Sequence, residues 1–285
     1  MKTGMVLEGG AMRGIYTAGV LDVFWEEEIR PEGVIGVSAG AIHGSCFISG
    51  QPGRSIRYYK KYSRDKRFFS LYSLMTTGSM VGEQFCYHDI PDRLDPFDFE
   101  AFARSPMAFY VACTDLATGR AVYHHCIDLK KEMDWMRASA SMPLVSKIVE
   151  INGGKYLDGG IADSIPIRAF RALGYERNIV VLTRPAGYQK KPQNPALVKR
   201  LYRSYPALVE MMQNRHLVYN HTLVLLEELE RRGEIFLLRP SEDLHIGRTE
   251  KNPARLTAQY ELGQKDARAR IKDLKRWLSE KKESK

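Results

Sequence analysis

Residues 33–40 read GVIGVSAG, an apolar run that ends in Gly36-Val37-Ser38-Ala39-Gly40. This pattern is G-x-S-x-G, and it stands between a predicted strand and a predicted helix of small residues. A nucleophile elbow requires that context, because its strand-to-helix turn is strained and leaves no room for bulky neighbours. The pattern alone is weak evidence, so its position between strand and helix carries the weight. We therefore predict that Ser38 is a nucleophile.

The chain before this pattern extends the strand-to-helix organisation. A predicted strand at 4–7 and a predicted helix at 14–28 precede the strand at 33–37 and the helix at 39–49. Such a β-loop-α-β-turn-α order begins a parallel sheet, in which strands end at the same edge. The loop after residue 7 should therefore lie near Ser38.

That loop lies in residues 7–14, which read LEGGAMRG. The backbone amides of Gly9, Gly10 and Ala11 are candidates for an oxyanion hole, and Arg13 either anchors the loop or adds positive potential. A phosphate-binding loop is the weaker alternative. The segment has no GK[ST] sequence, and Ala11 interrupts the pattern G-x-G-x-x-G.

A serine nucleophile also needs a base. One candidate is Asp158, in the sequence Tyr156-Leu157-Asp158-Gly159-Gly160, where two glycines permit close approach and offer N–H donors. Taken alone, these residues fit an ordinary Asp-Gly turn better. The other candidates are the seven histidines of a possible Ser-His-Asp triad, none of which lies in a glycine-rich context: His43, His88, His124, His125, His216, His221 and His245. An α/β-hydrolase reaches its elbow only after several strands, whereas Ser38 follows a single βα unit, which also disfavours a triad.

The rest of the chain alternates between strand and helix signals. The apolar patterning predicts strands at 108–113, 119–124, 148–151 and 178–183. It predicts helices at 53–63, 132–140, 164–173, 195–203, 206–232 and 253–279, with a loop at 184–195. We expect one α/β fold with a mainly parallel central sheet.

Composition limits the class of protein. The chain has 285 residues, 44% of them hydrophobic, which suits a globular domain with a sizeable core. No secretory signal or membrane span is visible, and the four cysteines lack metal-site spacing, so a cytoplasmic location is expected, with no metal ion and no cofactor. The net charge of +9 lies mainly in residues 185–285, where simple solubility is the first interpretation.

Together these stretches resemble the patatin-like phospholipase family. Its pattern is a GGxR-type oxyanion loop, then GxSxG, then DG[GA], and Ser-Ala-Ser-Met-Pro at 139–143 is also similar to a family segment. The resemblance covers roughly 4–172, with 173–285 as a continuation of the same fold that is basic and mainly helical. It implies a three-layer α/β/α fold with a mainly parallel sheet. The glycines that would support these motifs are Gly14, Gly36, Gly40, Gly159 and Gly160.

The resemblance also implies an activity: a lipid acyl hydrolase with a Ser38–Asp158 dyad that acts on a phospholipid or another acyl ester. An ordinary aspartate, with a pKa of about 3.9, is a poor base, so we expect Asp158 in a semi-dry cleft that raises its pKa. Two departures stand out. Ala11 replaces a glycine, where left-handed backbone would cost about 1 kcal/mol or more, and Glu8 stands where the family often has Asp.

A basic aromatic segment at 54–67 suggests a surface contact. Arg54, Arg57, Lys61 and Arg64 fall on one stripe of the predicted helix, with tyrosines between them. Such a stripe suits an anionic membrane surface, and a plain solvated face is the alternative. Nucleic acid is the less favoured partner, and the sequence leaves the oligomeric state open.

Two other functions remain as alternatives to the dyad hydrolase. One is a Ser-His-Asp esterase or acyltransferase that uses one of the histidines. The other is a basic protein that binds membranes or nucleic acid and keeps a vestigial hydrolase site.

Overall fold

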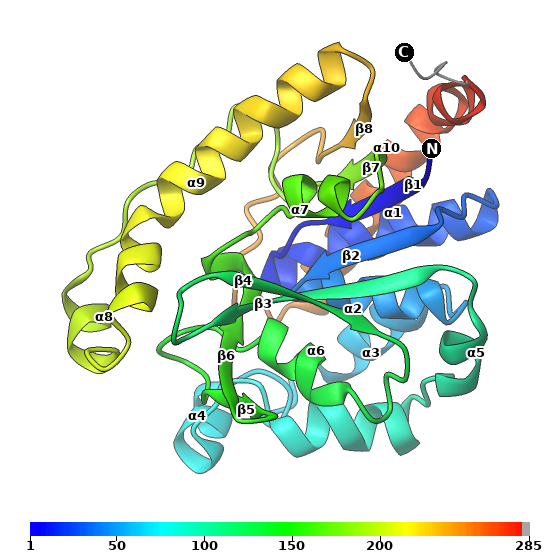
Figure 1. The fold of residues 1–285 in the computed structure, drawn as a ribbon. Coiled ribbons are helices and arrows are strands. Elements are labelled where there is room, and N and C mark those ends of the chain that lie inside the picture. The colour runs from blue at the N-terminus through cyan, green and yellow to red at the C-terminus, as the bar shows by residue number, and fades with distance from the viewer. Residues whose placement is uncertain (281–285) are drawn as a thin grey trace.

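Eight strands form one mixed sheet at the centre of the computed structural model, which describes residues 1–280. The strand order is β5-β6-β3-β2-β1-β7-β8, and β4 pairs with β3 off this path (Figure 1). The strands are β1 (Thr3–Leu7), β2 (Gly33–Val37), β3 (Ala108–Asp115), β4 (Ala121–Cys126), β5 (Val149–Ile151), β6 (Gly154–Asp158), β7 (Arg177–Val181) and β8 (Ile235–Leu238).

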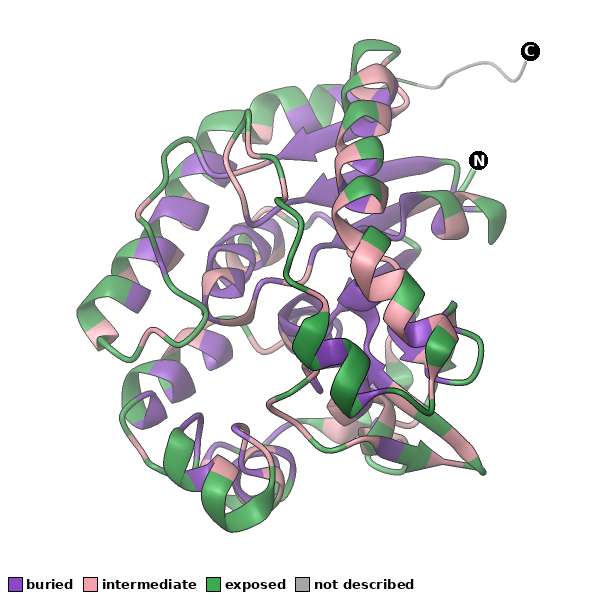
Figure 2. Cartoon of the chain, turned by 90° about the vertical axis from the view of Figure 1, so that its left-hand side faces the viewer, coloured by how far each residue is buried: buried purple, intermediate pink, exposed green. Residues whose placement is uncertain are grey.

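Strands β3, β2, β1, β7 and β8, which are neighbours in that order, run parallel. Strands β4 and β6 each pair antiparallel with β3, and β5 pairs antiparallel with β6. Strands β1, β2, β7 and β8 are buried along almost their whole length, as apolar runs in a sheet covered on both faces should be (Figure 2). The expected three-layer α/β/α fold with a mainly parallel sheet is confirmed, with an antiparallel extension at the β5 edge.

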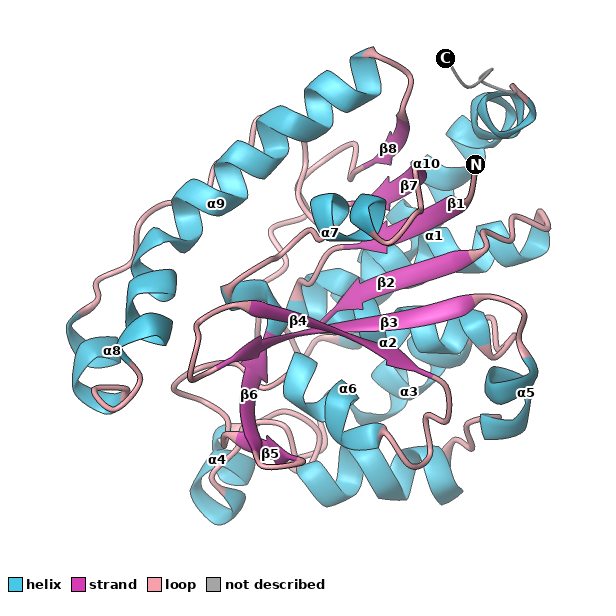
Figure 3. Cartoon of the chain, viewed as in Figure 1, coloured by secondary structure: helices cyan, strands magenta, loops and turns pink. Residues whose placement is uncertain are grey.

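Helices cover both faces of the sheet (Figure 3). One core cluster joins the sheet to α1, α2, α6 and α10, and another joins it to α7 and α9. The α-helices are α1 (Ile15–Glu26), α2 (Ala39–Ile48), α3 (Arg54–Tyr62), α4 (Leu71–Thr77), α5 (Phe99–Arg104), α6 (Met133–Ser139), α7 (Ile167–Ala172), α8 (Ala196–Leu201), α9 (Pro206–Arg231) and α10 (Pro253–Ser279). Short 3₁₀ turns η1 (Ala11–Gly14) and η3 (Gly159–Ile161) and a π-helix η2 (Phe85–Leu94) complete the fold.

The last helix, α10, packs along the first, α1, with the backbones very close. A Cβ on Gly19 would lie 2.0 Å from the carbonyl oxygen of Tyr260, and a Cβ on Gly263 would lie 2.1 Å from that of Tyr16. Leu274 is fully buried in the same core. The apolar side chains of α10 therefore pack within the chain. The basic end of the sequence, 281–285, lies outside the described residues.

Four short helices and strands of the structure, α4, α5, β6 and β8, were not predicted from the sequence. Helices α4 and α5 are six or seven residues long, too short to show a helical period. Strand β6 contains Gly154 and ends in the Asp-Gly sequence, which resembles a turn, and β8 is only four residues long. Within residues 1–280, no helix combines the length and apolar character needed to cross a membrane.

Candidate active site

Ser38 occupies a strained turn at the end of β2. Its backbone has φ 54° and ψ −122°, and α2 begins at the next residue. A non-glycine residue in such a backbone conformation costs about 1–3 kcal/mol of folding free energy, so the surrounding structure must hold Ser38 there. Glycines permit this: a Cβ on Gly36 would lie 2.4 Å from the Cα of Ala41, and one on Gly40 would lie 2.5 Å from the carbonyl oxygen of Leu7.

Ser139 fixes the backbone of this turn. Its Oγ accepts a hydrogen bond from the Ser38 amide at 2.8 Å and donates one to the carbonyl oxygen of Ala112 at 2.7 Å. Ser139 lies at the end of α6 and is fully buried. It therefore ties the elbow to β3. Sequence reasoning placed Ser139 in a segment similar to the family but assigned it no role.

We expect Ser139→Ala to destabilise the fold by about 1–3 kcal/mol, because the Ser38 amide would lose its buried acceptor. Urea unfolding of the two proteins measures this difference. Ser141→Ala is the matched control, since the Ser141 hydroxyl donates to the carbonyl oxygen of Arg137 at 2.8 Å, in the adjoining helix α6. Equal stability losses in the two variants would contradict the role given to Ser139.

Asp158 reaches Ser38 through the register of three strands. In β3, Ala112 pairs with Val37 of β2 and the next residue, Cys113, pairs with Asp158 of β6. The end of β6 thus lies beside the elbow. A Cβ on Gly159 would lie 2.2 Å from the carbonyl oxygen of Ala112, so only glycine lets the chain turn there against β3.

The Asp158 carboxylate is buried, with an exposed fraction of 6%. Burial raises its pKa, and this outweighs the opposing effects of Arg215, of a hydrogen bond from the Ser38 side chain and of the Gly160 amide, which donates to Oδ1 at 2.7 Å. The expectation of a semi-dry cleft with a raised pKa is confirmed. The result is a stronger base than an exposed aspartate.

The glycine loop lies against the elbow from the other side. A Cβ on Gly9 would lie 3.1 Å from the Cβ of Ser38, so the loop backbone closely approaches the serine. Ala11 has φ 48°, which places this alanine in the left-handed region that favours glycine. The loop therefore has a glycine-like backbone conformation at Ala11, which is strained for an alanine. The Arg13 amide is already bonded to the carbonyl oxygen of Gly10, at 3.1 Å.

Glu8 anchors this loop, a role that sequence reasoning missed. Its Oε2 accepts hydrogen bonds from the amide and hydroxyl of Thr183 at 2.6 and 3.0 Å, and its Oε1 accepts one from the Tyr219 hydroxyl at 2.6 Å. Glu8 thereby links the end of β1 to the segment after β7 and to α9. Glutamate has one more methylene than aspartate, and this length lets the Glu8 carboxylate reach both Thr183 and Tyr219.

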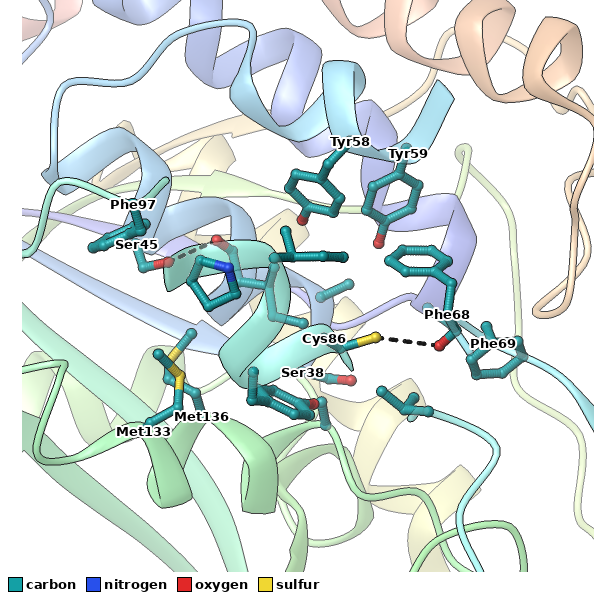
Figure 4. A pocket seen from close by; sticks show the side chains of 18 of the residues that line it. Ser38, Ser45, Tyr58, Tyr59, Phe68, Phe69, Cys86, Phe97, Met133 and Met136 are labelled. Carbon is teal, nitrogen blue, oxygen red and sulfur yellow. Dashed lines mark hydrogen bonds between the residues drawn. The ribbon is translucent and has the colours of Figure 1, made fainter. Parts of the chain in front are cut away.

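Two cavities meet at Ser38, and both are also lined by Ala11, Phe69 and Met142. The first encloses about 970 Å³ and is almost entirely apolar, with aromatic and methionine side chains facing its interior (Figure 4). The second, of about 1400 Å³, is polar and contains Asp158 and the glycine loop. An ester whose acyl chain occupies the first cavity would present its carbonyl to Ser38, at the junction of the two.

No histidine lines either cavity, and all seven histidines fall within the described residues. His43, on α2, is buried; its Nδ1 lies 2.9 Å from the Ser55 hydroxyl, and burial lowers its pKa to about 3. Neither cavity therefore brings a histidine to Ser38, whereas the polar cavity holds Asp158.

Comparisons with known proteins place the chain in a family. The model of the family described as patatin-like phospholipase matches residues 5–171. The chain belongs to the patatin-like phospholipase family. A second family model, a domain of unknown function named DUF6363, matches residues 205–279.

Relatives of this family member come from bacteria and fungi. The uncharacterized protein YjjU of Escherichia coli is 29% identical, over 98% of this chain and 80% of its own length. An uncharacterized NTE family protein of Mycobacterium tuberculosis is 22% identical, over 76% of this chain and 60% of its own. The lysophospholipase nte1 of Aspergillus niger is 27% identical, over 61% of this chain but only 11% of its own.

The basic stripe differs from the prediction. Arg54 is buried, with its guanidinium 3.4 Å from the Asp95 carboxylate, and Arg57 binds the same carboxylate at 2.7 Å. Placing Arg54 on an exposed stripe was therefore wrong, because Asp95 draws it inward. Lys61 and Arg64 are exposed. The aromatic residues of this segment and directly after it turn inward to the core and the apolar cavity: Tyr58, Tyr59, Tyr62, Phe68 and Phe69.

Proposed function

We propose that this member of the patatin-like phospholipase family is a lipid acyl hydrolase that cleaves carboxylic esters through Ser38 and Asp158. One observation carries the proposal: Ser38 is held in a strained elbow beside a buried aspartate of raised pKa, and it lines a large apolar cavity. The lysophospholipase name of the fungal relatives supports the same class of reaction.

The reaction proceeds in two steps. The Ser38 hydroxyl attacks the ester carbonyl as Asp158 takes its proton, and the tetrahedral oxyanion accepts hydrogen bonds from amides of Gly9, Gly10 and Ala11. Collapse of this intermediate breaks the ester bond; Asp158 returns the proton to the leaving alcohol, and an acyl-Ser38 remains. Water then attacks the acyl group, Asp158 accepts its proton, and the fatty acid leaves as Ser38 regains a proton.

The apolar cavity gives this site its acyl specificity. It is lined by side chains from α3, α6 and the π-helix, with Met133 and Met136 contributed by α6 (Figure 4). Apolar cavities bind apolar ligands by burying their surface. A histidine-dependent esterase is less well supported, because no histidine among the described residues lines the site. A cytoplasmic location and contact with a membrane surface stay predictions.

We expect Met133→Trp to shorten the preferred acyl chain, since indole would fill part of the cavity. The value of kcat/KM for p-nitrophenyl palmitate should fall at least about tenfold relative to that for the butyrate ester, as expected when several methylenes lose their place. Met75→Trp is the matched control, because Met75 is 79% exposed on α4. An equal change for both esters would contradict the assignment of this cavity to the acyl chain.

The test of the function uses purified protein and p-nitrophenyl octanoate, a neutral ester. Release of nitrophenol together with labelling of Ser38 by a fluorophosphonate, located by mass spectrometry, would support the proposal. Folded protein that neither releases nitrophenol nor takes up the label at Ser38 would make the elbow a structural turn, and the binding-protein alternative would then lead.

A further inference from the structure

Five cationic side chains gather in the polar cavity beside Ser38: Arg13, Arg184, Lys190, Arg215 and Arg248. The cavity contains only two carboxylates, Glu8 and Asp158. If all seven groups are ionised, the positive charge exceeds the negative by three. The cluster is more than the dyad requires, since one cation would be enough to balance Asp158.

The two carboxylates are already occupied by other donors. Glu8 is bound by Thr183 and Tyr219, and Asp158 by the Gly160 amide and Ser38. Within the described part of the chain, the buried Nε–H groups of Arg13, Arg184 and Arg215 have no hydrogen-bond partner. Arg184 has a carboxylate nearby, Asp243 at 3.9 Å, and Arg248 is exposed, so the unmet need for an acceptor falls on Arg13 and Arg215. Burying a cation without an acceptor is costly, and these two guanidinium groups therefore favour an anion in the cavity.

The cations also lower one another's affinity for protons. Burial and the charge of Arg184 lower the pKa of Arg13, and burial lowers that of Arg215. Burial, Arg215 and Arg248 lower the pKa of Lys190 to about 7. A bound anion would relieve this repulsion.

The cluster lies next to the reacting atoms. A Cβ on Gly160, two residues after Asp158, would lie 3.1 Å from Arg215 Nη2 and 3.0 Å from Asp158 Oδ1. Lys190 Nζ lies 3.8 Å from the ring centroid of Tyr219 and 3.4 Å from the Ser164 hydroxyl. An anion here would be joined to the ester at Ser38 by a short linker such as glycerol.

Four of the five cations, all but Arg13, lie outside the patatin-like region of residues 5–171. Two of these four come from a segment with its own family match. Arg215 lies on α9 and Arg248 precedes α10, and both fall in the segment matched by the domain of unknown function, 205–279. The segment therefore supplies part of the wall of the cavity that holds Ser38.

We infer that this cationic cluster binds the phosphate of a phosphate-bearing acyl ester, such as a lysophospholipid, and that residues 205–279 complete the active site by supplying Arg215 and Arg248. Guanidinium groups suit this ligand, because their paired N–H donors match phosphate oxygens. The inference rests on the proposed hydrolase function for its catalytic consequence, but the binding site can be measured without turnover.

The first experiment compares two substrates with the same acyl ester, decanoyl lysophosphatidic acid and monodecanoylglycerol. We expect Arg248→Gln and Arg215→Gln each to lower the ratio of kcat/KM for the anionic over the neutral substrate at least about tenfold, the usual effect of losing a charged hydrogen bond. The ratio is the readout because any effect of Arg215 on Asp158 alters both substrates. Arg104→Gln is the control, since Arg104 is 73% exposed on α5. A ratio unchanged in both cluster variants would overturn the inference.

The second experiment measures binding without turnover, by isothermal titration calorimetry on the Ser38→Ala protein. Glycerol phosphate should bind saturably and Arg248→Gln should weaken that binding at least about tenfold. Inorganic phosphate that binds as tightly would show a site for free phosphate and overturn the substrate assignment. Binding of glycerol phosphate without hydrolysis of any ester would support the phosphate site and contradict the proposed hydrolase function. Hydrolysis without such binding would support the hydrolase function and contradict the phosphate site.

Discussion

Ser38→Ala is expected to lower kcat for ester hydrolysis by about ten-thousand-fold or more, because without the hydroxyl no acyl-enzyme can form. The elbow, the glycine loop and both cavities would remain, so only their binding and electrostatic effects could still speed the reaction. The measurement is the initial rate on p-nitrophenyl octanoate, together with fluorophosphonate labelling of the intact protein. The variant should take up no label at position 38.

Ser45→Ala provides the matched control for Ser38. Ser45 lines the same apolar cavity, but its hydroxyl donates to the carbonyl oxygen of Ile42. Activity and labelling should stay near those of the wild type. If Ser38→Ala unfolds at the same temperature as the wild type yet retains its activity, Ser38 is not the nucleophile.

Asp158→Asn should slow labelling and hydrolysis by about a hundredfold to ten-thousandfold, the range that a positioned general base contributes. The amide oxygen of asparagine can still accept the hydrogen bond that the Gly160 amide donates at 2.7 Å, so the turn is kept. Asparagine cannot take the proton from Ser38. The loss should therefore appear in the rate of acylation, measured by stopped-flow labelling.

The same aspartate sets the acid side of the pH profile. Burial raises the pKa of Asp158 above its ordinary value of 3.8, and only the ionised form is a base. Activity of the wild type should therefore fall as the pH falls, with a midpoint for kcat/KM above 3.8. Asp158→Asn should lose this limb of the profile.

Asp163→Asn is the control for Asp158. Asp163 also has a pKa raised by burial, but its carboxylate accepts from the Tyr123 hydroxyl at 2.8 Å, and Asp163 lines neither of the cavities that meet at Ser38. Its replacement should leave the labelling rate within about threefold of the wild type, as for a group outside the reacting atoms. Equal losses at the two aspartates would rule out a specific dyad and leave the protein in need of another base.

Much of the fold followed from local pattern. The strand at 33–37 has the predicted bounds, and the long helices at 206–232 and 253–279 are within one residue of theirs. These segments have either an uninterrupted apolar run or many turns of helical period. The short elements α4, α5 and β8 lack both. Strand β6 was missed because it begins at Gly154 and is followed directly by Gly159, so it resembles a turn.

Some residues in and around the site could likewise be predicted from local sequence, and others could not. The motifs pointed to Ser38, Asp158 and the glycine loop, which the structure brings together, because a strained turn and a close backbone approach demand glycine or small residues at fixed spacing. Arg54 shows the opposite case. Its helical stripe predicted exposure, but Asp95, forty-one residues later, turns it into the interior.

By itself, then, the sequence determined the parallel α/β core and the residues whose backbone geometry the chemistry requires. Only the tertiary structure decided what surrounds them: Ser139 under the elbow, Glu8 across to α9, and the cations brought to the cleft from 184–248. The physical reason is the range of the constraint. A turn leaves its mark on adjacent residues, whereas a charge that enters a cavity from a distant helix requires no particular neighbours in the sequence.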